Sequence, residues 1–238
     1  MSSQSRETVC KGMLFITGTD TGVGKTVVTL GLMHRLQSMG CQVAGMKPVA
    51  SGCERSADGL RNGDALALQR HSSIDLTYEA VNPCAYAPPV APHIAAQEVG
   101  HPIRIGTLAE QARSLAGRVD CLLIEGVGGW RVPVSEHQTM ADLARGLGIA
   151  VVLVVGVRLG CLNHALLTTE SILSGGLSLA GWVANVIPPE PERMQQNIDT
   201  LRMRIPAPLL AIIPPLKRPD AESVAGSFSS EIANILFK

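Results

Sequence analysis

Residues 18–26 include the residue types that bind phosphate groups. They read G-T-D-T-G-V-G-K-T, between the apolar run 13–16 and a helical pattern that starts near Thr26. A glycine turn between a strand and a helix aims backbone N–H groups and the positive end of the helix at a phosphate. Lys25 can then contact terminal phosphates, and the Thr26 hydroxyl can contact Mg²⁺. The pattern predicts binding of a nucleoside triphosphate.

This loop is a variant of the standard one. The standard spacing places a glycine five residues before Gly24, but Thr19 stands there, and Gly18 lies one residue further back. Glycines after a strand can simply make a tight turn, and Gly-Lys-Thr can occur by chance. The apolar run upstream and the helical spacing of apolar residues downstream favour phosphate binding.

Two carboxylates are candidate Mg²⁺ ligands, because this ion takes hard oxygen ligands. Glu125 ends the apolar run 121–124 and precedes glycines, where a second strand would deliver a metal carboxylate. A carboxylate that caps a turn is the alternative for Glu125. Asp64 can be brought to the same edge by the loop after Ser51, or it can be the N-cap of a helix over 65–69. Spacing alone does not decide between the two roles of Asp64.

Lys47 follows the apolar run 42–46 and precedes a proline. Its backbone is therefore expected to be extended and its side chain to lie at a strand end. A lysine there can be only a solvated charge. Ser51 and glycines follow closely, which favours a cation that neutralises charge on a transferred phosphoryl group or a carboxylate-like intermediate.

The elements that position these residues are predicted from apolar runs that alternate with helix-length segments. The runs are 13–16, 42–46, 121–124, 150–155, 179–184 and 209–213, and the segments include 107–116, 140–147, 164–173 and 192–203. This alternation predicts a single-domain α/β fold with a doubly wound, mainly parallel sheet and helices on both faces. Ligands of such sheets bind at the carboxyl ends of the strands. Polar and glycine-rich segments follow the runs, so we expect one active-site edge.

Composition favours small-molecule partners. The chain has 238 residues, with 20 basic and 20 acidic residues and a pI near 7.0. This balance gives no basic field for a nucleic acid or an anionic membrane. No apolar run reaches the roughly 18 residues of a membrane span, and the first twelve residues lack the apolar segment of a signal peptide. We expect a soluble, cytoplasmic protein.

Other segments are less informative. Six cysteines occur without a C-x-x-C pair, so neither a zinc site nor a disulfide framework is predicted. We expect residues 1–12 to be a disordered N-terminal extension, 88–92 to be a stiff surface loop and 229–237 to be a short helix.

Six blocks of sequence together resemble the dethiobiotin synthetase family. They are the phosphate loop, G-M-K-P-V-A-S-G, L-R-N-G-D-A-L-A-L-Q, E-G-V-G-G-W, V-V-G-V-R-L-G-C-L-N-H-A and G-W-V-A-N. The likeness runs from about Met13 to Leu216 and keeps the order and spacing of the family. No single block is decisive, but the set is highly specific. The resemblance implies the P-loop NTPase (nucleoside triphosphatase) type of fold.

The resemblance also implies a reaction. Enzymes of this family close the ureido ring of dethiobiotin, in biotin biosynthesis, from 7,8-diaminononanoate (7,8-diaminopelargonate), CO₂ (or bicarbonate) and ATP. A substrate amine takes up CO₂ as a carbamate, and ATP phosphorylates that carbamate. The neighbouring amine then attacks the mixed anhydride with loss of phosphate. The chain would thus be an ATP- and Mg²⁺-dependent ligase that gives ADP and phosphate.

Residue roles follow from the same resemblance. It makes Lys25 and Lys47 catalytic cations and makes Thr26, Asp64 and Glu125 Mg²⁺ ligands, which favours the metal role of Asp64 over the helix cap. The ATP-binding residues that it implies are Gly22, Val23, Gly24, Lys25, Thr26, Val27, Asp64, Glu125, Gly126, Val127, Gly128, Asn185, Pro214, Pro215 and Leu216, with Asn185 reading the adenine. The substrate-binding residues that it implies are Thr21, Lys47, Ser51, Gly160, Cys161, Leu162 and Asn163.

The segment 160–163 begins a predicted helix, whose unpaired N–H groups can hold a carboxylate. In the resembled family, this helix start of the other subunit holds the far carboxylate of the diamine, which implies a homodimer with shared sites. A plain helix start packed within one subunit is the alternative. Two positions depart from the family pattern: Gly22 and Val186 stand where acidic residues are also seen.

Two rival functions fit the same fold. Partition-type ATPase switches carry a lysine five residues before the phosphate-loop lysine, but Asp20 occupies that position here. The chain also lacks a basic DNA-binding face and an amphipathic membrane-targeting tail. The second rival is an ATP-dependent amidoligase. Lys47 with Ser51 favours the smaller diamine substrate, through the resemblance alone.

Overall fold

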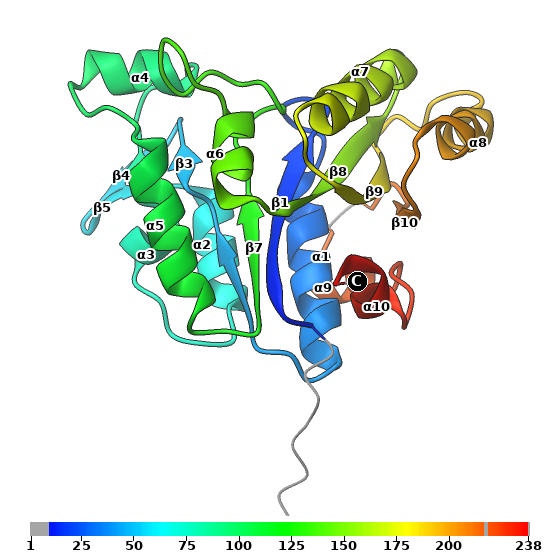
Figure 1. The fold of residues 1–238 in the computed structure, drawn as a ribbon, viewed down its shortest axis with the longest axis horizontal. Coiled ribbons are helices and arrows are strands. Elements are labelled where there is room, and N and C mark those ends of the chain that lie inside the picture. The colour runs from blue at the N-terminus through cyan, green and yellow to red at the C-terminus, as the bar shows by residue number, and fades with distance from the viewer. Residues whose placement is uncertain (1–9, 217–218, 238) are drawn as a thin grey trace, which may run out of the picture.

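The computed structural model describes residues 10–216 and 219–237. A parallel sheet lies at its centre, with the strand order β10-β9-β8-β1-β7-β2 (Figure 1). Its strands are β1 (Gly12–Gly18), β2 (Val43–Met46), β7 (Cys121–Glu125), β8 (Ala150–Val157), β9 (Leu179–Val186) and β10 (Leu209–Ile213). The predicted parallel α/β sheet is confirmed. Two short pairs lie beside it: β3 (Val49–Ala50) with β6 (Cys84–Ala85), and β4 (Glu54–Ser56) with β5 (Gly59–Arg61).

The sheet is buried on both faces, because its central strands send apolar side chains in both directions. In β1, Phe15 belongs to one apolar core, and Leu14 and Ile16 belong to the other. Leu153 and Val154 divide between the two cores in the same way on β8. Alternate residues of a strand point to opposite faces, so a continuous apolar run fills two cores at once.

Helices supply the other half of each core (Figure 1). One core takes residues from α4 (Pro92–Glu98), α5 (Ile105–Ala116), α6 (Met140–Leu147), α7 (Cys161–Ser174) and α8 (Met194–Arg204). The other takes residues from α1 (Lys25–Ser38), α2 (Gly63–His71), α3 (Tyr78–Val81), α9 (Ala221–Ala225) and α10 (Ile232–Leu236). Helices on both faces were predicted. The helices α2, α3 and α4 lie between β2 and α5, where the apolar pattern predicted no complete set of elements.

Three sequence expectations need correction. Cys10 is fully buried and Gly12 begins β1, so the predicted disordered extension is wrong for residues 10–12, and residues 1–9 lie outside the described residues. Cys10 and Cys41 form a disulfide with Cα atoms 6.4 Å apart, which no cysteine spacing indicated. The expected loop over 88–92 ends where Pro92 begins α4, since proline fits the first turn of a helix.

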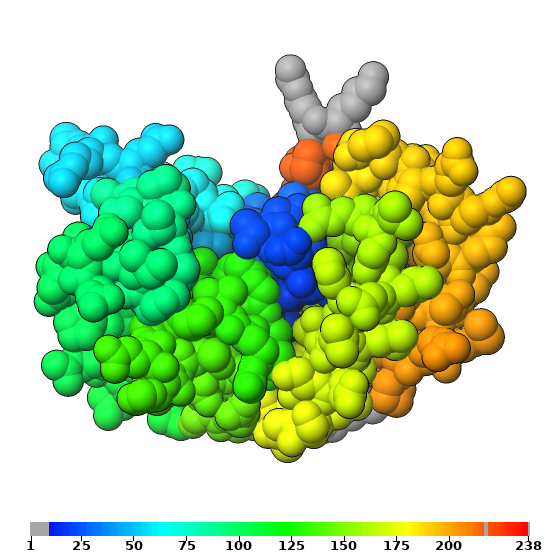
Figure 2. Space-filling model, turned by 90° about the horizontal axis from the view of Figure 1, so that it is seen from above, coloured from blue at the N-terminus to red at the C-terminus, as the bar shows by residue number. Residues whose placement is uncertain are grey.

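The carboxyl ends of the strands form one edge of the molecule. The phosphate loop follows β1 at this edge, and in Figure 2 it is the blue region between the cyan-to-green half and the yellow-to-orange half. The segments that follow β2 and β7 reach the same edge. No helix within the described residues is long and apolar enough to cross a membrane.

Candidate active site

The phosphate loop has a backbone that only glycine adopts easily. Gly22 and Gly24 have φ angles of 73° and 86°, in the left-handed region. Gly24 is the N-cap of α1, which begins at Lys25. A Cβ atom at Gly24 would collide with the side chain of Asn185, whereas one at Gly22 would meet no atom within 4 Å. The loop thus leaves its N–H groups free of side-chain cover at the start of a helix, as phosphate binding requires.

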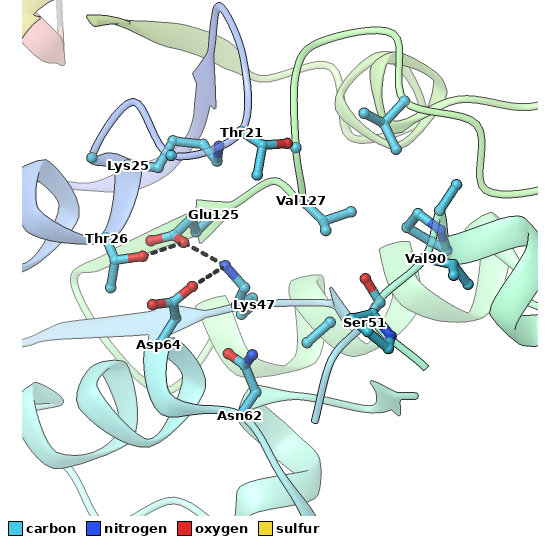
Figure 3. Close-up of a pocket in the computed structure, with 18 of the residues that line it drawn as sticks. Thr21, Lys25, Thr26, Lys47, Ser51, Asn62, Asp64, Val90, Glu125 and Val127 are labelled. Atoms are coloured by element: carbon cyan, nitrogen blue, oxygen red, sulfur yellow. Dashed lines mark hydrogen bonds and ion pairs between the residues drawn. The ribbon is translucent and has the colours of Figure 1, made fainter. Parts of the chain in front are cut away.

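Lys47 lies at the centre of a charged cluster (Figure 3). Its Nζ donates hydrogen bonds to Glu125 Oε1 at 2.6 Å and to Asp64 Oδ2 at 2.9 Å. The Thr26 hydroxyl donates to the same Glu125 oxygen at 2.8 Å. These residues come from the segment after β2, the end of β7 and the first turns of α1 and α2. The sequence-predicted cation, hydroxyl and two carboxylates therefore meet at one point.

Burial and charge act on this cluster in opposite directions. The Lys47 and Glu125 side chains are 6% and 0% exposed, whereas that of Asp64 is 47% exposed. Burial alone would lower the pKa of Lys47, but the charges of Glu125 and Asp64 outweigh burial and raise that pKa above its ordinary value. Partial burial would raise the pKa of Asp64, but the charge and hydrogen bond of Lys47 lower it. The ion pairs therefore keep Lys47 and Asp64 charged.

Lys25 has the opposite electrostatic environment. Its Nζ donates to the backbone oxygen of Asp20 at 3.1 Å, and its side chain is mostly buried. Burial, together with the charge of Lys47, lowers the pKa of Lys25 from 10.5 to about 8. An anionic phosphate in the loop would favour its charged form, because opposite charges at short range stabilise one another.

The structure decides how Asp64 reaches the site. Asn62 is the N-cap of α2 and its side chain accepts a hydrogen bond from the Ala65 N–H at 3.2 Å, so the alternative reading of Asp64 as the cap is wrong. Asp64 lies in the first turn and its carboxylate is directed to Lys47. Glu125 receives its hydrogen bonds from the side chains of Thr26 and Lys47, which does not fit the alternative role of a turn cap.

The donor set fits a magnesium ion. Glu125 Oε2 is buried and has no hydrogen-bond partner within the described part of the chain, so one carboxylate oxygen is free to bind a cation. Thr26 and Asp64 add a hydroxyl and a second carboxylate beside it. The site has two carboxylates, and residues 10–216 and 219–237 contain no larger group, of three or more His, Cys, Asp or Glu side chains, that could hold a metal. A site with two carboxylates and a hydroxyl suits Mg²⁺, which keeps several waters and substrate phosphates as ligands.

A cavity of about 660 Å³ opens beside the charged cluster. More than half of its lining residues were predicted from sequence: Thr21, Gly22, Gly24, Lys25, Thr26, Val27, Lys47, Ser51, Asp64, Glu125, Val127 and Gly128. Sequence reasoning missed the remainder: Ala50, Asn62, Pro89, Val90, Ala91, Pro92, Val132 and Pro133. Most of these residues are apolar. Ala50 and Asn62 lie within two of the quoted sequence blocks and residues 89–92 within the expected loop, but their place in the lining becomes visible only in the folded chain.

Other predicted residues lie outside the lining of this cavity. Val23 and Asn185 are buried, and the Asn185 Nδ2 donates to the Val23 oxygen at 2.9 Å, so the amide holds the phosphate loop against β9. Gly126 follows β7 and packs beside Phe15. Residues 214–216 directly follow β10, and Val186 is buried at the end of β9. The base-reading role of Asn185 stays a prediction.

The predicted carboxylate-binding segment begins α7. Gly160 is its N-cap, with a φ angle of 92°, and the helix starts at Cys161, as expected. Within its own chain this segment does not line the 660 Å³ cavity. Leu159, next to it, is fully exposed, and Leu167, two turns into α7, is 57% exposed. At the helix start, Gly160 and Asn163 are exposed in the single chain, whereas Cys161 is 3% exposed and packs in the core.

The fold and the site together define a P-loop NTPase: a parallel sheet, a glycine loop that leads into α1, and a hydroxyl and two carboxylates beside that loop. A family model described as "AAA domain" matches residues 13–223. The septum site-determining protein MinD of Pyrococcus horikoshii, in complex with Mg-ADP, has a similar fold, with a TM-score of 0.54, 19% identity and coverage of 94% of this chain and 88% of that one. A ParA family ATPase from Chlorobium tepidum gives a TM-score of 0.53 at 13% identity, covering 95% and 97%. These likenesses show the fold alone.

Sequence relatives are much closer than these structures. The ATP-dependent dethiobiotin synthetase BioD of Pseudomonas paraeruginosa is 53% identical over 212 residues, which cover 89% of this chain and 93% of that protein. BioD 1 of Escherichia coli is 47% identical over 214 residues, covering 90% and 95%. The chain belongs to the dethiobiotin synthetase family.

Proposed function

We propose that the protein is an ATP- and Mg²⁺-dependent ligase that closes the ureido ring of dethiobiotin from 7,8-diaminononanoate and CO₂. Family membership supports the reaction, and the convergence of Lys47, Thr26, Asp64 and Glu125 beside the phosphate loop is the observation that carries it. Phosphoryl transfer needs positioned cations more than covalent catalysis by the protein. Such a reaction on ATP suits a cytoplasmic enzyme.

Each side chain of the charged cluster has a role in this chemistry. Lys25 would bind the terminal phosphates of ATP from within the loop. Lys47 would neutralise the carbamate oxygens and the transferred phosphoryl group, since charge that develops in a buried site is stabilised strongly by a fixed cation. Thr26, Asp64 and Glu125 would hold Mg²⁺, which screens the charge of the phosphates.

The cavity suits a diamine that has an aliphatic chain. Thr21 and Ser51 line the same cavity as Lys47, and they are the polar residues that we assign to the reacting end of the substrate. Pro89 to Pro92, with Val127, Val132 and Pro133, give the cavity an apolar wall. Methylene groups would bury their surface there, while the amines and the carbamate stay near the charged cluster.

We further propose a homodimer whose sites combine residues of both chains. The diamine has a carboxylate at the far end of its chain, and the start of α7 is a helix N-terminus that can bind one. Exposed Leu159 and Leu167 support an interface on this helix. A second cavity, lined by Leu167, Thr168 and Ser171 of α7, shares Thr21, Val132 and Pro133 with the 660 Å³ cavity. A partner helix seated there would therefore reach the substrate cavity.

Complementation between two inactive variants tests the shared site. Lys25→Gln disables the phosphate loop, and Gly160→Ile places a branched side chain at a φ angle of 92° and distorts the helix start. When equal amounts of the two variants are refolded together, random pairing makes about half of the dimers mixed. Each mixed dimer has one intact site of its two, so about a quarter of full activity should return. If mixtures that native mass spectrometry shows to contain the heterodimer recover no activity, the whole site lies within one chain.

ATP turnover distinguishes the ligase from a switch ATPase of the same fold. We expect release of ADP and phosphate to depend on both 7,8-diaminononanoate and bicarbonate, because the carbamate must form before it is phosphorylated. A switch ATPase would turn over ATP at the same rate without either compound, and that result would overturn the proposal.

A further inference from the structure

The backbone at Lys47 is tied to α3 by two residues. The Lys47 N–H donates to the Val81 oxygen at 2.8 Å, and the Lys47 oxygen accepts from Asn82 Nδ2 at 2.6 Å. Asn82 is 2% exposed and its Oδ1 accepts from the Tyr78 hydroxyl at 2.9 Å. Tyr78 is the first residue of α3 and Asn82 is its C-cap, whose N–H donates to the Tyr78 oxygen at 2.7 Å.

The same hydrogen bonds continue to the helix that carries Asp64. The Tyr78 hydroxyl accepts from the Asn62 backbone N–H at 2.7 Å, and Asn62 caps α2 through the Ala65 N–H. Asp64 lies two residues after Asn62, in the first turn of α2. The ring of Tyr78 is also held from outside, because the Arg61 guanidinium lies 4.2 Å from its centroid. A continuous hydrogen-bond path therefore runs from the Lys47 oxygen to the start of α2.

We propose that Tyr78 and Asn82 are positioning residues that set the separation of Lys47 from Asp64, and so tune the binding of Mg²⁺ and the placement of the catalytic cation. The path closes a ring: it joins the backbones of the two residues whose side chains meet at 2.9 Å. Asp64 is 47% exposed, so its ion pair with Lys47 depends on where the start of α2 is held, and the Asn62 N–H fixes that start against the Tyr78 hydroxyl. Outer partners of metal ligands typically change metal affinity or activity by about 10-fold to 100-fold when they are removed.

The buried polar atoms of Asn82 and the Tyr78 hydroxyl all have hydrogen-bond partners within this network, as expected of a network that holds the backbone rigidly. Asn82 uses its Nδ2 on Lys47 and, at 3.5 Å, on the Cys84 oxygen, and it uses its Oδ1 on Tyr78. The Tyr78 hydroxyl both donates and accepts. Removing that hydroxyl leaves the Asn82 Oδ1 and the Asn62 N–H without these partners, so the path breaks at its middle while the aromatic ring and its packing remain.

The test compares Tyr78→Phe with Tyr86→Phe. Tyr86 is the matched control: it is 2% exposed and its hydroxyl donates to the His101 oxygen at 2.8 Å, away from the site. Titration calorimetry would measure Mg²⁺ binding to the protein saturated with a non-hydrolysable ATP analogue. We expect Tyr78→Phe to weaken Mg²⁺ about tenfold and to lower kcat by about tenfold, while the metal-free affinity for the analogue changes less than about twofold. Tyr86→Phe should match the wild type in all three.

The inference would be overturned if Tyr78→Phe, shown to be folded by circular dichroism, had the Mg²⁺ affinity and kcat of the wild type. Equal effects of Tyr78→Phe and Tyr86→Phe would also overturn it. Should Tyr78→Phe fail to fold, Asn82→Ser, which is too short to bridge Tyr78 and Lys47, takes its place with the same readouts. The catalytic part of the inference rests on the proposed function. A wild type that makes no dethiobiotin would refute that function, whereas the Mg²⁺ titration would still test the positioning role.

Discussion

Replacing Lys47 with methionine tests whether the carboxylates of the site depend on one buried cation. Nζ lies 2.6 Å from Glu125, whose side chain is fully buried, and 2.9 Å from Asp64. Methionine keeps the unbranched stem of lysine but removes its charge. Glu125 would then keep its hydrogen bond from the Thr26 hydroxyl but would have lost its cation. An uncompensated buried charge costs about 3 to 5 kcal/mol. Asp64 is 47% exposed and can regain water, so we expect the free energy of unfolding at pH 7 to fall by about 3 kcal/mol.

Urea denaturation followed by tryptophan fluorescence measures this change, because Trp130 and Trp182 are both buried and report unfolding. Lys11→Met is the control, since Lys11 is exposed. The pKa of Asp64 is lowered in the folded state, so its stabilisation is present above its unfolded pKa of 3.8 and is lost as pH falls through the folded value. That acid-dependent loss should be smaller in Lys47→Met. Equal stability of the two methionine variants at pH 7 would show that the buried Glu125 carboxylate does not depend on the Lys47 charge.

Three further predictions concern the phosphate loop. Lys25→Gln should lower turnover by at least about a hundredfold, or about 2.7 kcal/mol of transition-state stabilisation, and near-normal kcat in the folded variant would contradict the assignment. The pKa of Lys25 is lowered from 10.5 in the unfolded chain to about 8 in the folded state. Between these two values the folded protein binds fewer protons than the unfolded chain, so the free energy of unfolding should rise as pH increases from 8 to 10.5. ATP binding at pH 8.5 should therefore take up protons, as calorimetry in buffers of different ionisation enthalpy can show, and Lys25→Gln should abolish the uptake. Gly24→Ala should weaken ATP binding more than Gly22→Ala, because both residues have positive φ angles but only a Cβ at Gly24 would collide with Asn185; equal affinities would contradict this.

The main sheet could be predicted because its strands are apolar on both faces. The run 150–155 falls within β8, and the residues that follow the strands met at one edge as parallel pairing requires. The phosphate loop, Lys47 and Glu125 were found because each stands at the carboxyl end of an apolar run. Asp64 was left undecided by spacing, because the cap of its helix is Asn62, two residues earlier, and a short polar loop gives no periodic signal.

The region between β2 and α5 could not be predicted from local pattern. β3 has two residues and is defined by its partner β6, more than thirty positions away in the sequence. Tyr78 and Asn82 carry no motif, and their importance comes from contacts with Lys47 and Asn62. The Cys10–Cys41 pairing is likewise a product of the fold, which brings the start of β1 beside the end of α1. Such long-range contacts leave no trace in hydrophobic periodicity.

Mass-spectrometric detection of dethiobiotin would test ring closure by this protein itself. Purified protein would be incubated with 7,8-diaminononanoate, ¹³C-labelled bicarbonate and Mg-ATP, with Lys25→Gln as the control. Closure of the ureido ring by this protein predicts dethiobiotin that carries one ¹³C atom, formed together with one ADP and one phosphate per molecule, and none from the variant. ATP consumption without labelled dethiobiotin, at a rate that the diamine does not change, would contradict it.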